Sequence, residues 1–323
     1  MPPTLTEQLN TLWTTTWQNM RTEAIDQVFG EHPFWFWLSH KGKRRTEAGG
    51  RYISIPLSYG KNTTFTTLGM GGQVDITRQE KLMPTQWNWK YAAISVIRYW
   101  IEGLQNRGKA QIMSIMKNEL ENAKLSMAER LEEMLYGDGT GNGGKDFDGL
   151  GNIVAIDPTT GTVGGLNSAT YDWWRNKTKN MSGEPMSTYL ITRMRTMYND
   201  VSKGQGSGTP DFLLTTQTIF EYYESEVQEQ KQIVNQALGD AMFETVNFKG
   251  KPVTWAEKCP SGRLFFLNSR HLEWVADPAA NFYMTKWKEM ANQVDDAVAQ
   301  IAVAGNLVCN NRQRQGVIYN IDE

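Results

Sequence analysis

One glycine-rich segment has the spacing of a phosphate-binding loop. Residues 139–146 read GTGNGGKD, and Gly139, Gly144 and Lys145 match the glycines and the lysine of that pattern. The pattern continues with a Ser or Thr that binds magnesium, whereas here the next residue is Asp146. A phosphate loop also follows a strand and opens a helix, but this segment closes a long helical pattern. It therefore predicts a turn-rich connection, with a nucleotide-binding enzyme as an alternative.

The same stretch resembles a calcium loop in its first half. Asp138, Thr140, Asn142 and Gly143 stand at the first, third, fifth and sixth positions. The twelfth position, where a bidentate Glu belongs, is Gly149. A turn is the better interpretation, and weak binding of a surface cation is the alternative.

Other catalytic patterns are missing from the sequence. It contains no nucleophile elbow, no histidine-bearing metal motif and no cysteine nucleophile with its local signature. His271 falls in a predicted strand, where we expect a packed or surface residue. Cys259 and Cys309 lack metal-ligand spacing, so we expect reduced structural thiols and synthesis in the cytoplasm. No enzyme activity, metal or cofactor is expected.

Composition limits the possible partners. The chain has 323 residues, 40% of them hydrophobic, which is enough for a sizeable core. Its 33 Lys and Arg against 35 Asp and Glu give a net charge of -2, so no overall field draws it to DNA or to an anionic membrane. The N-terminus does not read as a signal peptide, and the longest apolar run, 91–101, is interrupted by Arg98. We expect no membrane contact and only local contact with nucleic acid.

The N-terminal region predicts an arm. Residues 4–29 have the capping and apolar spacing of an amphipathic helix, and the aromatic run 34–38 follows. This run either packs on its own domain or packs on a neighbouring subunit. The basic cluster 41–45 is interpreted as a solvated face, with a DNA-binding site as the alternative.

Residues 50–91 predict a long β-hairpin. Period-two alternation at both ends of the segment flanks a middle that is rich in Thr and Gly, KNTTFTTLGMGGQ. That middle has too few large apolar residues to bury itself, so alone it should be only marginally ordered.

Residues 109–136 predict a long spine helix, because the segment has no Pro or Gly and carries one apolar stripe. The stripe consists of Met113, Met116, Leu120, Ala123, Met127, Leu131 and Met134. A methionine stripe of this kind is typical of core packing.

The rest of the chain predicts a mixture of helices and strands in an order too irregular for a doubly wound sheet, hence an α+β protein. The expected helices are 188–203 and one from about 218, and the expected strands are 211–215, 245–248, 253–256, 263–267, 273–276 and further β-structure over 299–321.

The order of these parts resembles the major capsid proteins of tailed bacteriophages. The segments that carry the resemblance are the tryptophan-rich arm, the Thr and Gly hairpin, YAAISVIRYWIEGLQNRGKA, LYGDGTGNGGKDFDGL, DFLLTTQTIFEYYE and FKGKPVTWAEKCPSGRLFFLNSRHLEWV. The resemblance implies the Hong Kong 97-type capsid fold. Its parts would be an N-terminal arm over 1–49, an extended β-hairpin loop over 50–91, a peripheral domain over 92–155 plus 297–323, and an axial domain over 156–296.

The resemblance also implies a function and partners. The chain would be a structural head protein that assembles as hexamers and pentamers into an icosahedral or prolate shell around double-stranded phage DNA, without sequence-specific binding. Because Met1 leads at once into the arm helix, we expect a separate scaffolding protein. The resemblance implies a portal protein as a further partner and a decoration protein as an optional one. Assembly would take place in the host bacterial cytoplasm and leave the chain in the virion.

Contacts between subunits are expected from the arm and the extended loop. The residues assigned to them are Trp13, Trp17, Phe34, Trp35, Phe36, Trp37, Arg44, Arg45, Lys61, Phe65 and Met70. The alternative function is the shell of an encapsulin-like protein compartment, which has a similar fold but encloses enzymes.

Overall fold

The computed structural model describes residues 32–105, 115–202, 208–227 and 246–322. Helices and strands are mixed along these ranges without regular alternation, which confirms the α+β class. The chain divides into two compact units. Of the described residues, unit 1 holds those within 93–128 and 284–301, and unit 2 holds those within 30–92, 129–283 and 302–323.

The predicted spine helix is helix α4 (Ile115–Tyr136), and the start predicted at 109 lies outside the described residues. The buried side chains of α4 follow the predicted stripe and extend it at the C-terminal end; the hydrophobic ones are Ala123, Met127, Leu131, Leu135 and Tyr136. Leu120 and Met134, on the same stripe, are half-buried. The side chains of Met113 and Met116 lie outside the described part.

The chain folds back tightly where α4 ends. A Cβ atom on Gly149 would lie 2.5 Å from the carbonyl oxygens of both Met134 and Gly137. Only glycine permits this approach, so the glycine-rich segment after α4 is a close-packed turn.

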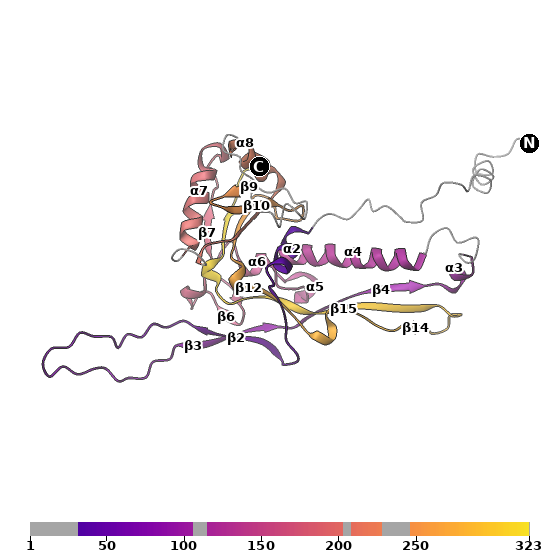
Figure 1. Cartoon of the computed structure of the whole chain (residues 1–323), viewed down its shortest axis with the longest axis horizontal. Coiled ribbons are helices and arrows are strands. Elements are labelled where there is room, and N and C mark those ends of the chain that lie inside the picture. The colour runs from indigo at the N-terminus through magenta and orange to yellow at the C-terminus, as the bar shows by residue number, and fades with distance from the viewer. Residues whose placement is uncertain (1–31, 106–114, 203–207, 228–245, 323) are drawn as a thin grey trace, which may run out of the picture. The chain divides into compact units, whose positions relative to one another are not determined.

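A six-stranded sheet forms the core of unit 2. Its strand order is β7 (Lys177–Asn180), β16 (Gly316–Tyr319), β11 (Leu264–Leu267), β8 (Phe212–Thr215), β10 (Lys251–Trp255) and β9 (Val246–Phe248). The two central strands β8 and β11 are buried along their whole length, as their continuous apolar sequences FLLT and LFFL predict. Helix α7 (Met186–Val201) packs on β7 and β16, and helix α8 (Gln217–Val227) packs on β10 (Figure 1).

The start of unit 2 contains a helix that the sequence did not reveal. The aromatic run forms α2 (Pro33–His40), which leads into strand β1 (Arg44–Thr46). β1 pairs in parallel with β12 (Leu272–Ala276), and β12 pairs antiparallel with the end of β15 (Ala297–Cys309). The predicted arm therefore contributes helix α2 and, through β1, the edge strand of a second sheet that contains β12 and β15.

The predicted hairpin is a paired ladder only at its base. Strands β2 (Tyr52–Ser58) and β3 (Leu82–Asn88) are antiparallel, with Ser58 opposite Leu82 and Tyr52 opposite Asn88. Residues 59–81 between them, which include the Thr- and Gly-rich middle of the predicted hairpin, contain no strand (Figure 1). We call residues 59–81 the extended loop.

Unit 1 is built around the first half of β15. Strands β14 (Lys288–Glu289) and β4 (Lys90–Arg98) both pair with β15. The short helix α3 (Trp100–Gln105) follows β4, and the Trp100 N–H donates to Asp296 Oδ1 at 2.7 Å.

The remaining elements are short. They are α5 (Gly141–Gly144), α6 (Leu150–Ile153), β5 (Thr162–Val163), β6 (Leu166–Asn167), β13 (Tyr283–Met284) and 3-10 turns at Asp172–Trp174, Ser269–His271, Pro278–Ala280 and Arg312–Arg314. Among the described helices, none is both long and apolar enough to cross a membrane.

Candidate assembly surfaces

The extended loop presents large apolar side chains to solvent. Phe65 is 88% exposed, Ile76 is 95% exposed and Met70 is fully exposed. Leu68 and Val74 are about half exposed as well. A single subunit gives these side chains nothing to pack against, and such exposure is typical of a surface that another molecule covers.

Short polar contacts shape the loop from within. Asp75 Oδ1 accepts from the N–H and hydroxyl of Thr77, which holds the pKa of that carboxyl below its usual range. Across the loop, the Thr63 N–H donates to Gln79 Oε1 at 3.2 Å. These contacts join polar groups without forming a strand ladder, and the large apolar side chains of the loop stay exposed.

The base of the hairpin is held firmly on unit 2. The Gln86 N–H donates to the Gly164 carbonyl at 2.8 Å, and Gly164, with φ +59°, lies against the ring of Trp87. Tyr59 stacks on Trp173 with ring centroids 5.2 Å apart. The extended loop therefore begins at a fixed place on the subunit.

Half of the aromatic run lies in the interior of the subunit. Phe34 and Trp37 are 0% and 1% exposed, and Trp37 stacks on Phe212 with centroids 4.7 Å apart. This corrects the expectation that Phe34 and Trp37 contact a neighbouring copy, since their own chain already covers them. The sequence left both possibilities open because an aromatic run looks the same in a buried helix and in an arm.

Trp35 and Phe36 are half-buried on the same helix. Trp35 packs edge-on against Trp274 and Phe282, with centroid distances of 5.3 and 6.1 Å. The Arg44 guanidinium lies 5.0 Å from the centre of the Trp35 ring, a cation–π contact that fixes both side chains.

The basic cluster is partly neutralised by its own subunit. Arg45 lies 3.0 Å from Glu47 and 3.8 Å from Glu273, all on exposed or half-exposed positions. With Arg44 held over Trp35, two of the four basic side chains are engaged within the chain. This arrangement favours the solvated-face interpretation over a DNA-binding site.

The remaining predicted contact residues fall in two places. Lys61, Phe65 and Met70 lie together on the extended loop and are exposed. Trp13 and Trp17, with the predicted helix over 4–29, lie outside the described residues.

Sequence reasoning missed an exposed apolar group in unit 1. Its members are Tyr99, Trp100, Ile101, Leu104, Trp287 and Val294, each between 37% and 71% exposed. Arg98 lies beside them, 3.8 Å from Asp295 and 5.9 Å from the centre of the Trp287 ring. The signal was the apolar run 91–101, which resumes after Arg98 and so continues past the end of β4.

The glycine-rich loop does not have the geometry of a phosphate site. Both the Lys145 and Asp146 N–H groups donate to the Gly141 carbonyl, at 3.2 and 3.3 Å. Asn142 and Gly143 are left-handed, and the Asp146 carboxylate packs against the Gly141 backbone. The amide groups that would hold a phosphate are thus occupied, and a carboxylate lies where the anion would bind.

The segment with the spacing of a calcium loop likewise forms a turn, since Asp138 Oδ1 accepts hydrogen bonds from the N–H and the hydroxyl of Thr140. Across the described ranges, no group of three or more His, Cys, Asp or Glu side chains is placed to hold a metal ion.

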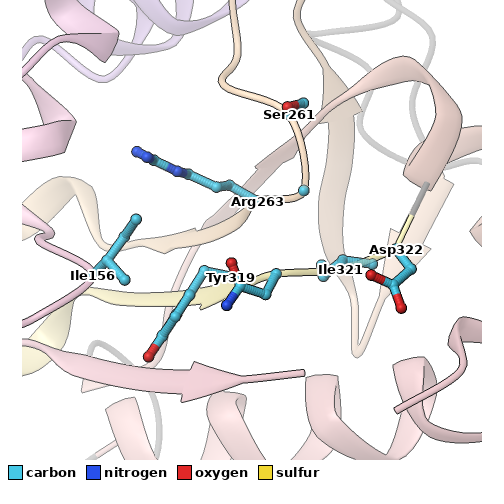
Figure 2. A pocket seen from close by; sticks show the side chains of 8 residues that line it. Ile156, Ser261, Arg263, Tyr319, Ile321 and Asp322 are labelled. Atoms are coloured by element: carbon cyan, nitrogen blue, oxygen red, sulfur yellow. The ribbon is translucent and has the colours of Figure 1, made fainter. Parts of the chain in front are cut away.

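One polar hollow lies in unit 2 beside the last strand (Figure 2). Its volume is about 430 Å³, and its lining includes Ser261, Arg263, Tyr319 and Asp322. Neither a histidine nor a cysteine lines this hollow.

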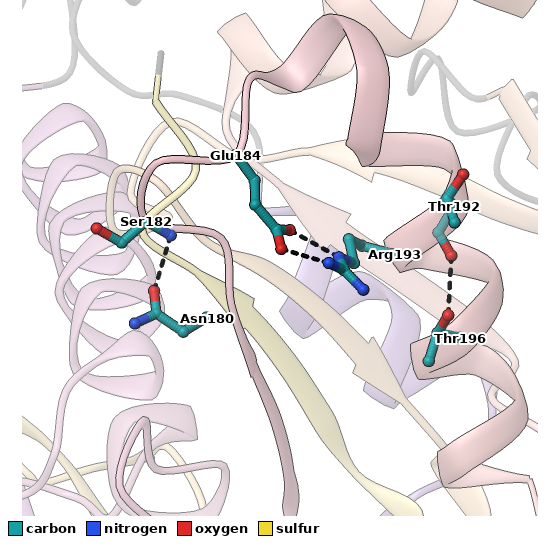
Figure 3. A network of polar contacts seen from close by, with 6 residues as sticks. All are labelled: Asn180, Ser182, Glu184, Thr192, Arg193 and Thr196. Atoms are coloured by element: carbon teal, nitrogen blue, oxygen red, sulfur yellow. Dashed lines mark hydrogen bonds and ion pairs between the residues drawn. The ribbon is translucent and has the colours of Figure 1, made fainter.

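A surface network near the start of α7 has a structural role (Figure 3). Arg193 contacts both carboxylate oxygens of Glu184, with Nε donating to Oε2 at 2.6 Å, and this holds the pKa of Glu184 below its usual range. Nearby, the Ser182 N–H donates to Asn180 Oδ1 at 2.9 Å. These contacts fix the turn that leads from β7 into α7.

Comparison with known proteins identifies the fold. No family model matches the chain, and no relative is found among curated proteins. Among solved structures, the capsid of cyanophage A-1(L) is similar, with 15% identity, a TM-score of 0.70 and coverage of 95% of this chain and 97% of that chain. The capsid of Myoviridae phage XM1 has 10% identity, a TM-score of 0.59 and coverage of 95% and 97%. The holo-SrpI encapsulin complex of Synechococcus elongatus has 13% identity, a TM-score of 0.57 and coverage of 97% and 95%.

These similarities extend over nearly the whole length of both chains. At such low identity they show the fold, which is the Hong Kong 97-type capsid fold that the resemblance to tailed-phage capsid proteins implied. That prediction is confirmed.

Proposed function

We propose that this chain is the major capsid protein of a tailed bacteriophage. Copies of it would assemble as hexamers and pentamers into an icosahedral or prolate shell that encloses double-stranded DNA. Its role would be structural and not enzymatic. The observation that carries the proposal is the extended loop, whose apolar side chains need a second copy to cover them.

The energetic reason is the size of that exposed apolar surface. Burying a side chain such as Phe65 or Ile76 fully contributes about 1.5–3 kcal/mol. The loop has several such side chains, and neighbours in a closed array can bury all of them at once. The rigid base at Tyr59 and Trp87 supports this role, because a pre-positioned loop loses less freedom on binding.

Near-neutral charge supports the same role. With a net charge of -2, copies packed at high density repel one another weakly. Contact with the enclosed DNA would be local and independent of sequence.

The division into parts follows the fold family. We assign the arm to 1–49, the extended β-hairpin region to 50–91, the peripheral domain to 92–155 plus 297–315, and the axial domain to 156–296 plus 316–323. The last residues differ from the expectation from the sequence because β16 lies between β7 and β11 in the six-stranded sheet. A scaffolding protein, a portal and a decoration protein are the partners that such a shell would take. Its place would be the virion, after assembly in the cytoplasm of the host bacterium.

An encapsulin-like compartment is the second candidate, favoured by the similarity to the holo-SrpI encapsulin complex. The contents of the particle separate the two functions. Particles isolated from the native source are treated with nuclease, and their contents are then analysed for DNA and for protein. We expect nuclease-protected DNA of uniform length, whereas particles filled with an enzyme and free of DNA would assign the compartment function.

A further inference from the structure

Glu132 is a buried carboxylate that joins two helices. It lies near the C-terminal end of α4, is 1% exposed and accepts three hydrogen bonds. The donors are the Phe34 N–H at 3.2 Å, the Trp35 N–H at 3.1 Å and the Tyr136 hydroxyl at 2.8 Å. Two of the three donors therefore belong to the first turn of α2.

Helix α2 depends on this carboxylate because it has no cap of its own. The side chain of His32, at the N-cap position, makes no capping hydrogen bond, and Pro33 has no N–H. The free N–H groups of the first turn need an acceptor, and Glu132 supplies it from a position about 100 residues away in the sequence. If α2 left α4, its two N–H groups and the carboxylate would all return to water.

Two effects oppose each other at this group. Hydrogen bonds from Tyr136, Trp35 and Phe34 favour the charged carboxylate, while removal from water disfavours it. Removal from water is the larger effect and raises the pKa of Glu132 from 4.5 to about 7.

We propose that the docking of α2 onto α4 is linked to a proton carried by Glu132. Docking takes up this proton and undocking releases it. Lower pH therefore stabilises the docked position of α2 on α4. The inference concerns the single subunit and does not depend on what the assembled protein encloses.

The sign of the effect follows from the two states. Because the docked carboxyl has the higher pKa, docking is strongest below about pH 4.5 and weakens as pH rises to about 7. Above that value Glu132 is charged in both states, and its contribution no longer changes.

Other titratable groups lie around Glu132. Tyr136 is on the same helix and, with Cys259, is buried. His32 begins α2 and lies in the field of the ion pair between Glu129 and Lys258, whose charged atoms are 2.9 Å apart.

The histidine titrates with the opposite sign. Burial lowers the pKa of His32 below 6.5, so its effect strengthens docking as pH rises. The direction of the pH dependence therefore distinguishes the two groups.

Hydrogen exchange of the purified subunit tests the proposal. Amide protection of residues 34–40, corrected for intrinsic exchange, should fall about tenfold between pH 6 and pH 8. The central strand β8 provides an internal reference for pH effects on the whole fold. Equal protection of 34–40 at both pH values would overturn the proposal.

Two variants assign the effect to this carboxyl. Glu132→Gln should abolish the pH dependence, and Glu133→Gln, which removes an exposed charge one residue away, should retain it. Tyr136→Phe keeps the carboxyl and removes one donor, so the midpoint should move to higher pH even if Glu132→Gln does not fold. A fall that persists in Glu132→Gln, or a midpoint unmoved in Tyr136→Phe, would contradict the assignment.

Discussion

Tyr59 stacks on Trp173, with planes 15° apart, at the residue where the paired strands end and the extended loop begins. Beyond this stack the loop carries exposed apolar side chains. Before it, the hairpin is buried against its own subunit through Ile53, Leu57 and Trp87. The base of the hairpin thus packs on its own subunit, whereas its tip leaves apolar side chains exposed that a neighbouring copy could cover.

Gly164→Ala should loosen the base of the hairpin. A Cβ at this position would lie 2.9 Å from the Trp87 ring, and Gly164 has a left-handed φ of +59°. We expect a loss of about 1–3 kcal/mol in stability from strain alone. Thermal unfolding and the quenching of tryptophan fluorescence measure the effect.

Gly143→Ala is the matched control, because Gly143 has a similar φ of +67° with no atom within 4 Å of its Cβ position. This variant should show the loss of stability that comes from the left-handed φ alone, without a clash with the Trp87 ring. Equal loss of stability in the two variants would mean that contact with Trp87 does not hold the hairpin.

Leu131→Ala should destabilise unit 2, since Leu131 is 3% exposed on the stripe of α4. Removing a buried leucine side chain to this extent costs about 2–5 kcal/mol. Leu125→Ala on the same helix, where the side chain is 39% exposed, should cost far less. Chemical denaturation of both proteins gives the comparison, and similar midpoints would show that the stripe is not the buried face.

Lys145→Ala should leave folding and assembly unchanged. Lys145 is exposed, and its N–H is already bonded to the Gly141 carbonyl. Calorimetry with ATP and magnesium should give no binding signal for either protein. Binding by the parent that is lost in the variant would restore the nucleotide-site interpretation.

Much of the fold could be predicted because periodicity reports burial directly. The stripe from Ala123 to Leu131 and the apolar strands β8 and β11 were visible in the sequence for that reason. Helix α2 was not, because its hydrophobic residues are consecutive and its N-terminal acceptor, Glu132, is far away in the sequence. A helix cap that comes from a distant residue, as Glu132 caps α2, cannot be predicted from the local sequence.

The assembly surfaces were predictable only in part. The exposure of Phe65 and Met70 could be predicted because the Thr and Gly residues around them provide no core in which to bury them. Phe34 and Trp37 could not be placed, since hydrophobicity predicts burial but not which molecule provides it. Trp100 and Ile101 were hidden in a run that also fits a strand.

Replacing Phe65, Met70 and Ile76 together by Ser should leave the subunit folded and reduce assembly. These side chains are exposed and outside the core, so thermal unfolding of the isolated subunit should be unchanged, while the contacts that we propose between copies should be lost. Replacing Thr64, Thr66 and Thr67 by Ser alters the same loop with little loss of apolar area and should assemble normally. Normal shells from the first variant would show that the apolar side chains are not the contacts.

The most direct test shortens the extended loop itself. Tyr59 and Lys81 are joined by a hydrogen bond of 3.0 Å between the Tyr59 N–H and the Lys81 carbonyl, so residues 61–79 can be replaced by a short Gly-containing turn without disturbing the base. Size-exclusion chromatography with light scattering compares the shortened protein with the parent under conditions in which the parent forms shells. We predict a soluble, cooperatively folded subunit that forms no closed shell. Shells of normal size from the shortened protein would contradict the role given to the loop, and a parent that stays monomeric under every condition, with scaffold present, would contradict the shell function itself.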